Sequence, residues 1–564
     1  MPIVFPNYVL KTLNLINAAG FEAFVVGGAV RDLLLGTEPG DYDISTNARP
    51  EQAAAVLRDA GYTLVEKLGE NFGVIVAVTE GHALEIATFR NERYAYGEDA
   101  HRPVEVWYCD TLEEDLSRRD FTVNAMAMDA RGTLYDYHGG QADLQAGILR
   151  TVGDPRKRYG EDALRMYRAC RFVAQLGFTY VEGNDTAEDV AGEYDDSLPV
   201  WKNLRMAMEK AGKAVPSDMK TMGPDAQLTA FPGEDGFGQP GTKYRLKKRY
   251  TFDISRCSTL SLERVKAELD KMLLGKEAGK GLALFLSGGL ACARCRVREN
   301  GGETYVDVLP ELMHLSSLPQ NIRFHCYNVW EHILAAVDRS PRDLTLRWAL
   351  LLHDVAKGLP GIRGTTPDGY PNDHGHEKES ARMAETILTR LRYPRPFIRR
   401  VTWLVARHMR FAPMLIRKNN TLLRWIRSEA VGGTFRTEAD MREAFTQLTE
   451  LFLSDMGATW AGVLKEPVMA EGKKLGEEAV QIAGERMPVH TSDLNVRGKE
   501  IQALLDKEFP QRTSDHSEQE PPLLTVRDAM TYLLMRVQNG SVPNQKGDLL
   551  AAMDAKIQRM KRKE

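Results

Sequence analysis

Long apolar runs are missing from this chain of 564 residues. No stretch approaches the ~18 uninterrupted apolar residues that a membrane helix needs, so we expect no transmembrane segment. The first residues, MPIVFPNYVLKTLNL, lack the basic segment, apolar core and small-residue cleavage site of a secretory signal. These absences predict a cytoplasmic protein with no membrane partner.

Cysteine and net charge are also scarce. Six cysteines are too few for a disulfide scaffold, and Cys292 and Cys295, at CxxC spacing, lack the second pair that a structural zinc site requires. We expect them to be ordinary thiols. The formal net charge of −4 argues against an indiscriminate binder of polyanions, so any contact with nucleic acid must come from local basic patches.

The chain is longer than one hydrophobic core usually serves, which predicts several domains. Up to about residue 150, predicted helices alternate with β-branched strands such as FEAFVV, FGVIVAV and ALEIATF. The stretch 182–256 is polar and rich in Gly, Pro and Asp, so we interpret it as an insertion. Helical patterns dominate after it.

Two carboxylates lie two residues apart in DYDIS, so on a strand Asp41 and Asp43 share one face. Adjacent carboxylates repel each other unless a cation holds them, and a pair of Mg²⁺ ions would also activate a hydroxyl and stabilise a leaving phosphate. Glu85 alternates with apolar Leu84 and Ile86. It is the natural third metal ligand; the alternative is a glutamate that faces solvent.

Paired glycines follow the first predicted strand. Gly27 and Gly28 precede Arg31 at the start of a predicted helix. Bare backbone amides and the positive end of the helix dipole would receive a triphosphate there, although the glycines alone also fit a simple turn.

A histidine–aspartate pair interrupts a later apolar helix. His353 and Asp354 lie in LTLRWALLLHDVAKG, and burying these groups without partners would be strongly unfavourable. A metal ion would compensate, whereas the alternative is a hydrogen-bonded core histidine. Further candidate ligands surround the pair in the sequence: His325, His332, His374, His376, His408 and Asp455.

The first part of the chain resembles the class II tRNA nucleotidyltransferases, or CCA-adding enzymes, and the bacterial poly(A) polymerases of the polymerase β superfamily. The resemblance rests on GGAVRDLLLG, DYDISTNA, LEIATFRNE, EEDLSRRDFTVNAMAMD, LYDYHGGQADL, LRTVGDP and EDALRMYRACRFVAQLGF, which occur in this order. It implies a polymerase β-like α/β head, with Asp41, Asp43 and Glu85 as the catalytic Mg²⁺ ligands.

The same resemblance implies the nucleotide contacts. RRDFTVNA corresponds to the segment that contacts the ribose and phosphates, which implicates Arg118, Arg119, Asp120 and Asn124 together with Gly27, Gly28 and Arg31. Asp162 and Arg165 match the pair that reads the base edge of CTP or ATP in place of a template. On a predicted helix the two are three residues apart and share a face, which also fits a surface salt bridge. Arg168 and Arg171 extend that side toward the phosphates.

A loop between Arg90 and Arg102 corresponds to the flexible loop that in the family helps to switch from C to A addition. Its length favours full CCA addition over CC addition.

The His/Asp-rich part resembles the HD phosphohydrolase superfamily. The resemblance implies His332, His353, Asp354 and Asp455 as ligands of a first metal and His376 and His408 as ligands of a second; His325 and His374 compete with His332 and His376. Such ligands suit a transition metal such as Mn²⁺, Ni²⁺, Fe²⁺ or Zn²⁺. The implied reaction is hydrolysis of a phosphoester, as in a 2′,3′-cyclic phosphodiesterase or phosphatase.

We therefore expect an α/β head followed by an all-α neck, an all-α HD domain and a helical tail. The boundaries are 1–150 for the head, 151–181 and 257–315 for the neck, 182–256 for the insertion, 316–460 for the HD domain and 461–564 for the tRNA-binding tail. The expected activity is addition of CCA to tRNA from CTP and ATP, with no DNA partner. The alternatives are a poly(A) polymerase, an A-adding or CC-adding specialist, and an HD phosphohydrolase whose head only binds RNA.

Overall fold

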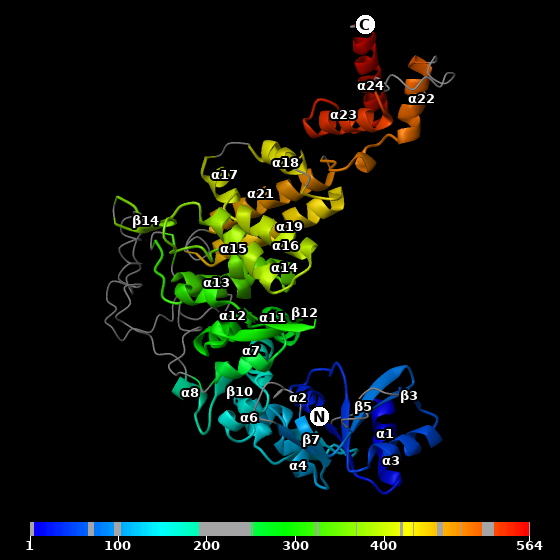
Figure 1. Cartoon of the computed structure of the whole chain (residues 1–564), viewed down its shortest axis with the longest axis vertical. Helices are drawn as coiled ribbons and strands as arrows, with labels where there is room; N and C mark the ends of the chain where they lie inside the picture. Colours follow the sequence, from blue (N-terminus) through cyan, green and yellow to red (C-terminus); the bar gives the residue numbers. More distant parts are fainter. Residues whose placement is uncertain are drawn as a thin grey trace. The chain divides into compact units, whose positions relative to one another are not determined.

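The computed structural model describes residues 5–65, 73–94, 103–190, 250, 252–299, 301–321, 324–325, 327–367, 369–417, 421–431, 434–459, 466–485, 487–509 and 524–562 (Figure 1). The chain forms two compact units. The first comprises Met1–Ile322, Tyr327–Asp338 and Ile387–Tyr393, and the second comprises Arg323–Cys326, Arg339–Thr386 and Pro394–Glu564.

A mixed sheet forms the centre of the head, with strand order β3-β4-β5-β2-β1-β8-β9. Its strands are β1 (Ala23–Val26), β2 (Asp43–Thr46), β3 (Thr63–Val65), β4 (Val74–Thr79), β5 (His82–Thr88), β8 (Met126–Met128) and β9 (Leu134–Asp136). β2 pairs parallel with β5 and antiparallel with β1. All four residues of β1 are buried, as their apolar side chains require at the middle of a covered sheet.

Helices and a hairpin complete the head. α1 (Asn7–Ala18) and α3 (Pro50–Asp59) pack together near β1, β3 and β4. The other elements are α2 (Gly28–Leu34), the hairpin β6 (Arg90–Tyr94) and β7 (Pro103–Tyr108), α4 (Leu112–Ser117), the 3₁₀ turn η2 (Thr122–Asn124) and α5 (Gly140–Gln145). The predicted switching loop lies at the end of this hairpin, and its residues 95–102 are outside the described part of the chain.

The region predicted as the neck is assembled from two distant segments. Its elements are α6 (Pro155–Glu161), α7 (Leu164–Leu176), β11 (Thr179–Val181), η3 (Ile254–Thr259), α11 (Leu262–Leu273) and α12 (Ala278–Ser287). β10 (Ile148–Arg150), at the end of the predicted head, pairs with β11, and α8 (Ala187–Val190) lies within the predicted insertion. α7 packs against both α11 and α12. Glycine permits the close approach, because a Cβ at Gly281 would lie 2.6 Å from the Cys170 carbonyl oxygen.

The predicted insertion leaves and re-enters the neck at one place. The Tyr180 ring lies 5.1 Å from that of Tyr250 and 5.7 Å from that of Phe252. Residues 191–249 and 251 are outside the described residues. The chain before the insertion and the chain after it are therefore side by side.

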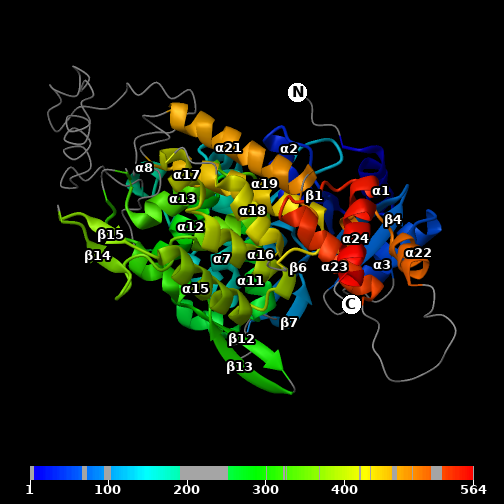
Figure 2. The same cartoon turned by 90° about the horizontal axis from the view of Figure 1, so that it is seen from above.

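The first unit continues with η4 (Leu290–Cys292), the hairpin β12 (Arg294–Glu299) and β13 (Gly302–Asp307), η5 (Pro310–Leu315) and α13 (Val329–Arg339). Figure 2 shows β12 and β13 side by side. The expected all-helical neck thus also carries strands. Cys292 is exposed and Cys295 is buried, and neither forms a disulfide.

The second unit is mostly helical. Its elements are α14 (Leu344–Leu352), the hairpin β14 (Arg363–Thr365) and β15 (Pro371–Asp373), α15 (His376–Arg390), α16 (Arg395–Arg407), α17 (Phe411–Arg417), α18 (Leu422–Val431), α19 (Glu438–Gly457), α21 (Glu466–Glu485), η6 (Thr491–Asp493), α22 (Gly498–Glu508), α23 (Val526–Gln538) and α24 (Lys546–Lys561). α21 packs along α19, whereas α22, α23 and α24 share a separate core that includes Ile501, Leu533 and Met553. The predicted fold class, an α/β head before mostly helical parts, is confirmed. No helix among the described residues is long and apolar enough to cross a membrane.

Candidate functional site

A cavity of about 440 Å³ opens in the first unit. Seven arginines and three aspartates line it with five other residues: Gly27, Gly28, Arg31, Asp43, Arg90, Arg118, Arg119, Asp120, Asn124, Asp162, Leu164, Arg165, Arg168, Phe172 and Arg264. The excess of guanidinium groups gives the cavity a positive charge that suits a polyanion such as a triphosphate.

Three carboxylates meet at two paired strands. Asp43 begins β2 and lies in register with Glu85 on the parallel strand β5, while Asp41 precedes β2 by two residues. Burial, followed by the charges of Asp41 and Glu85, raises the pKa of Asp43 to about 6. The raised pKa records mutual repulsion that bound cations would relieve, so the donor set fits Mg²⁺. Of the three carboxylates, Asp43 lines the cavity.

Gly27 makes room for an arginine at the edge of the cavity. Its φ is 76°, a region that favours glycine, and a Cβ there would lie 2.8 Å from Nη1 of Arg119. Arg31, one turn into α2, donates from Nη1 to Oδ1 of Asn124 at 2.7 Å. The glycine pair and the RRDFTVN segment therefore converge on one wall.

Asp120 joins the head to the neck helix α7. Its Oδ2 accepts from Nε of Arg168 at 2.8 Å, and its Oδ1 accepts from the Phe121 amide at 2.9 Å. Burial alone would raise the pKa of Asp120, but the Arg168 charge outweighs it and holds the pKa at about 2. Both partners line the cavity, so the pair also fixes where the Arg168 guanidinium stands.

Asp120→Asn is expected to lower stability at neutral pH by on the order of 2 kcal/mol, an effect that shrinks in acid. The folded pKa of about 2 is below the ordinary 3.8, so the carboxylate stabilises the fold above pH 3.8 and this contribution is lost as the pH falls toward 2. The midpoints of thermal unfolding at pH 7 and at about pH 2.5 measure it for both proteins. A difference between the unfolding midpoints of the two proteins that is the same at both pH values would contradict the assignment.

The structure corrects the predicted helix that would carry both Asp162 and Arg165. Asp162 is extended, with φ −140° and ψ 109°, and separates α6 from α7. Its Oδ1 accepts from the Leu164 amide at 2.9 Å, because an aspartate before a helix satisfies a first-turn donor. Asp162 and Arg165 therefore do not share a helix face; both nevertheless line the cavity.

Several residues in the cavity lining or in contact with it escaped the sequence analysis. Arg264 on α11 places Nη2 3.4 Å from Oδ2 of Asp162, although it is 102 residues away in the chain. Glu161 accepts from Nη1 of Arg165 at 2.6 Å. Its position in the EDALR motif, beside Asp162, was the sequence feature that could have identified it. Arg90, Leu164 and Phe172 also line the cavity. Arg171, expected at the phosphates, is absent from the lining and pairs with Glu268 at 2.7 Å.

A buried cluster in the second unit centres on Asp354. His353 at the end of α14 has Nε2 3.3 Å from Asp354 and 3.7 Å from Asp455 on α19. His376 Nε2 lies 3.1 Å from Oδ1 of Asp354, and His408 Nε2 lies 3.9 Å from the same atom. Ligand atoms of Asp354, His376 and His408 all lie within 4.8 Å of one another.

The imidazoles of this cluster are oriented by backbone carbonyls. Nδ1 of His353, His376 and His408 is 2.7 Å from the carbonyl oxygens of Leu350, Asp373 and Val405, respectively. A carbonyl only accepts, so each Nδ1 carries the hydrogen and each Nε2 faces the cluster.

The charge state of the cluster also fits a cation. Burial, then the nearby His353 and His376, lower the pKa of His408 to about 3, so its ring is neutral and its Nε2 offers a lone pair. An Nδ1–H fixed by a carbonyl, with Nε2 turned toward a carboxylate, is the arrangement of a metal ligand. Among such donors a transition metal is preferred over Ca²⁺.

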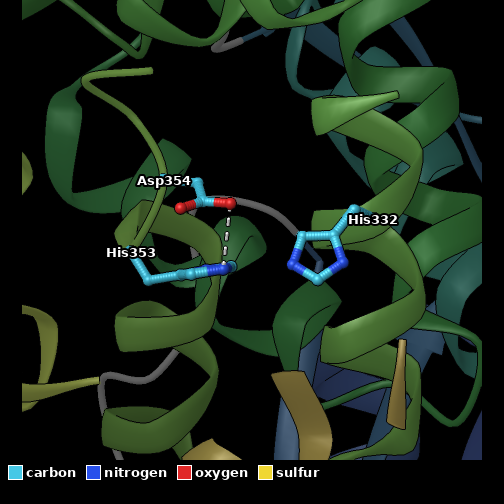
Figure 3. A group of neighbouring side chains, drawn as sticks. All are labelled: His332, His353 and Asp354. Carbon is cyan, nitrogen blue, oxygen red and sulfur yellow. Dashed lines mark ion pairs between the residues drawn. The ribbon is translucent and has the colours of Figure 1, made fainter. Parts of the chain in front are cut away.

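Figure 3 shows the ion pair of His353 and Asp354 and the ring of His332, which belongs to α13. His332 is fully buried, whereas His325 is partly exposed. His374 is exposed and its Nε2 is 2.7 Å from the amide of Asn372, so His376 is the inward-facing residue of that pair. Sequence analysis missed Lys357, whose Nζ lies 2.7 Å from Oδ2 of Asp354.

Comparison with known proteins gives two family matches. The Poly A polymerase head domain matches residues 23–150, and the HD domain matches residues 323–439. The resemblance drawn from the motifs is thereby confirmed, and the chain carries both domains.

Individual relatives are CCA-adding enzymes. That of Geobacillus thermodenitrificans is 48% identical over 170 residues, or 30% of this chain and 40% of the relative, and that of Geobacillus stearothermophilus is 41% identical over 222 residues, or 38% and 53%. The chain thus spans about half or less of the length of these relatives. The crystal structure of the Bacillus stearothermophilus CCA-adding enzyme in complex with CTP has the same fold, with TM-score 0.54, 22% identity and full coverage of both chains.

Proposed function

We propose, for a chain that carries a poly(A) polymerase head domain and an HD domain, that the protein adds CCA to the 3′ ends of tRNA from CTP and ATP. The observation that carries the proposal is the cavity, where seven arginines stand beside Asp43 and the Asp162–Arg165 pair. The relatives named as CCA-adding enzymes support it. Poly(A) addition and single-nucleotide specialisation are less favoured by these relatives.

The cavity residues divide into two tasks. Arg118, Arg119 and Arg168 present guanidinium groups to the triphosphate, since several N–H donors bind phosphate oxygens in parallel. Asp162 only accepts and Arg165 only donates, so together they select a base edge that offers an amino donor beside an unprotonated ring nitrogen, as cytosine and adenine do and guanine does not.

Mg²⁺, when bound by Asp41, Asp43 and Glu85, supplies activation of the RNA 3′-hydroxyl and neutralises charge at the α-phosphate. Asp43 stands at the edge of the cavity and brings this carboxylate set to the triphosphate. The reaction joins the 3′ oxygen to the α-phosphorus and releases pyrophosphate.

The buried histidine–aspartate cluster around Asp354 supports a second activity, metal-dependent hydrolysis of a phosphoester such as a 2′,3′-cyclic phosphate at an RNA end. His353, Asp354, His376, His408 and Asp455 would hold a transition metal with His332, and the oriented imidazoles are the supporting observation. The bound metal would supply an activated water.

Incubation of the protein with tRNA that lacks CCA, and with CTP and ATP singly and together, tests the polymerase proposal. Two C residues are expected with CTP alone, a complete CCA end with both nucleotides, and no extension of this tRNA with GTP or UTP. Long A tracts with ATP alone would instead establish a poly(A) polymerase, and an absence of incorporation would leave a head that only binds RNA.

A further inference from the structure

Asp115, on the short helix α4, lies within EEDLSRRDFTVNAMAMD, but neither the resemblance nor the mechanism gives this carboxylate a role. Its side chain is fully buried. Oδ1 accepts from Nε and Nη2 of Arg118 at 3.0 and 2.9 Å and from the Arg90 amide at 3.3 Å. Oδ2 accepts from Oγ of Ser45 at 3.0 Å and lies 3.6 Å from Nη2 of Arg119. One carboxylate thus joins β2, β6 and the RRD segment.

Each partner of Asp115 belongs to the cavity or to the metal-binding strand. Arg90, Arg118 and Arg119 line the cavity. Ser45 follows Asp43 by two residues on β2, so the hydroxyl contact ties that strand to the arginines. The cluster therefore sets the distance between the triphosphate-binding cations and the metal-binding edge of the sheet.

The electrostatics require the whole cluster to stay together. Burial would raise the pKa of Asp115, but the charges of Arg118 and Arg119 outweigh burial and hold its pKa below the ordinary value. The carboxylate is therefore ionised inside the protein, where an ion without partners is strongly destabilising. Movement of either arginine away from Asp115 is correspondingly disfavoured.

We infer that Asp115 is a positioning residue for the incoming nucleotide, which holds Arg118 and Arg119 in the arrangement that receives the triphosphate. A guanidinium has five N–H donors in a rigid fork, so Asp115 engages one side of Arg118 and orients the donors that remain. Such preorganisation removes the need to order flexible side chains when the nucleotide binds. The inference rests on the proposed nucleotidyltransferase function.

A second buried aspartate of the head provides a matched control. Asp143 on α5 accepts from Oγ1 of Thr122 at 2.7 Å and pairs with Arg150 at 3.2 Å. Neither Arg150 nor Thr122 lines the cavity. Asp143→Asn thus removes a buried charge and an ion pair of the same kind without touching a cavity arginine.

The test compares Asp115→Asn and Asp143→Asn in the full chain. Steady-state KM and kcat for CTP, ATP and tRNA are measured together with the thermal unfolding midpoint. In Asp115→Asn the KM for both nucleotides is expected to rise about tenfold or more, while the KM for tRNA stays within about twofold. Asp143→Asn is expected to lower the unfolding midpoint and to leave both nucleotide KM values unchanged.

Ser45→Ala provides a milder variant, because it removes one donor and leaves the carboxylate in place. Its nucleotide KM is expected to rise by about twofold to fivefold, which tests the inference even where Asp115→Asn does not fold. Unchanged nucleotide KM in both variants, or equal rises for tRNA and nucleotides, would overturn it. A wild-type protein that incorporates neither CTP nor ATP would instead overturn the proposed function.

Discussion

Asp43→Ala is expected to reduce nucleotide incorporation into tRNA by about a thousandfold or more, equivalent to about 4 kcal/mol of transition-state stabilisation. Asp43 lies in register with Glu85 and is the carboxylate of the set that lines the cavity. Its removal takes a ligand from the proposed Mg²⁺ site and leaves the arginines in place. The loss is therefore expected in kcat far more than in the KM for CTP, measured by single-nucleotide incorporation at saturating Mg²⁺.

An exposed carboxylate of the same domain controls this experiment. Asp59, at the end of α3, is exposed and is not part of the cavity lining, so Asp59→Ala is expected to incorporate nucleotides like the wild type. Hydrolysis of a 2′,3′-cyclic phosphate by Asp43→Ala should also be unchanged. Near-normal incorporation by Asp43→Ala would refute the assignment of the metal site.

His353→Ala combined with Asp354→Ala is expected to abolish phosphoester hydrolysis while CTP and ATP incorporation persists. The two residues are buried and Asp354 lies within ion-pair distance of two histidines besides His353 and of Lys357. Removing one member of a buried ionic group costs about 3–5 kcal/mol, so the double variant needs a measurement of folding beside the assay.

A gentler change separates loss of metal from loss of fold. His408→Gln keeps much of the side-chain volume and removes the Nε2 atom that would bind the metal. The amount of transition metal bound per protein, measured by elemental analysis, is expected to fall together with the hydrolytic activity. His374→Ala is the matched control, because His374 is exposed and lies two residues from His376. Metal content equal to wild type in His408→Gln would exclude His408 as a ligand. A single substitution that eliminates both activities would contradict the proposal that the two active sites work independently.

Residues in regular, alternating strands were accessible to sequence reasoning. The two-residue period of a strand places Ile44 in the core and turns Asp43 toward the cavity, and the same period separates Glu85 from the buried Leu84 and Ile86. These positions follow from local geometry. The placement of Gly27 and Arg31 was also local, because the turn from a strand directly into a helix needs a positive φ, which glycine adopts readily.

Contacts that depend on the tertiary fold were not accessible. Helical periodicity continues through Asp162, but its carboxylate satisfies the Leu164 amide and so starts a new helix. Arg264 reaches the cavity only because α11 returns to α7 after the insertion. His374 and His376 are equivalent by spacing, and the hydrogen bond from His376 to the Asp373 carbonyl decides between them.

The two-segment neck has a consequence for the order in which the protein is made. Asp162 and its partner Arg264 are 102 residues apart, and α7 gains its packing against α11 and α12 only after these helices have been synthesised. A ribosome that has just released α7 therefore holds a head whose cavity still lacks Arg264. Loop closure over such a separation slows folding, so the cavity is completed late, after the entire insertion has left the exit tunnel.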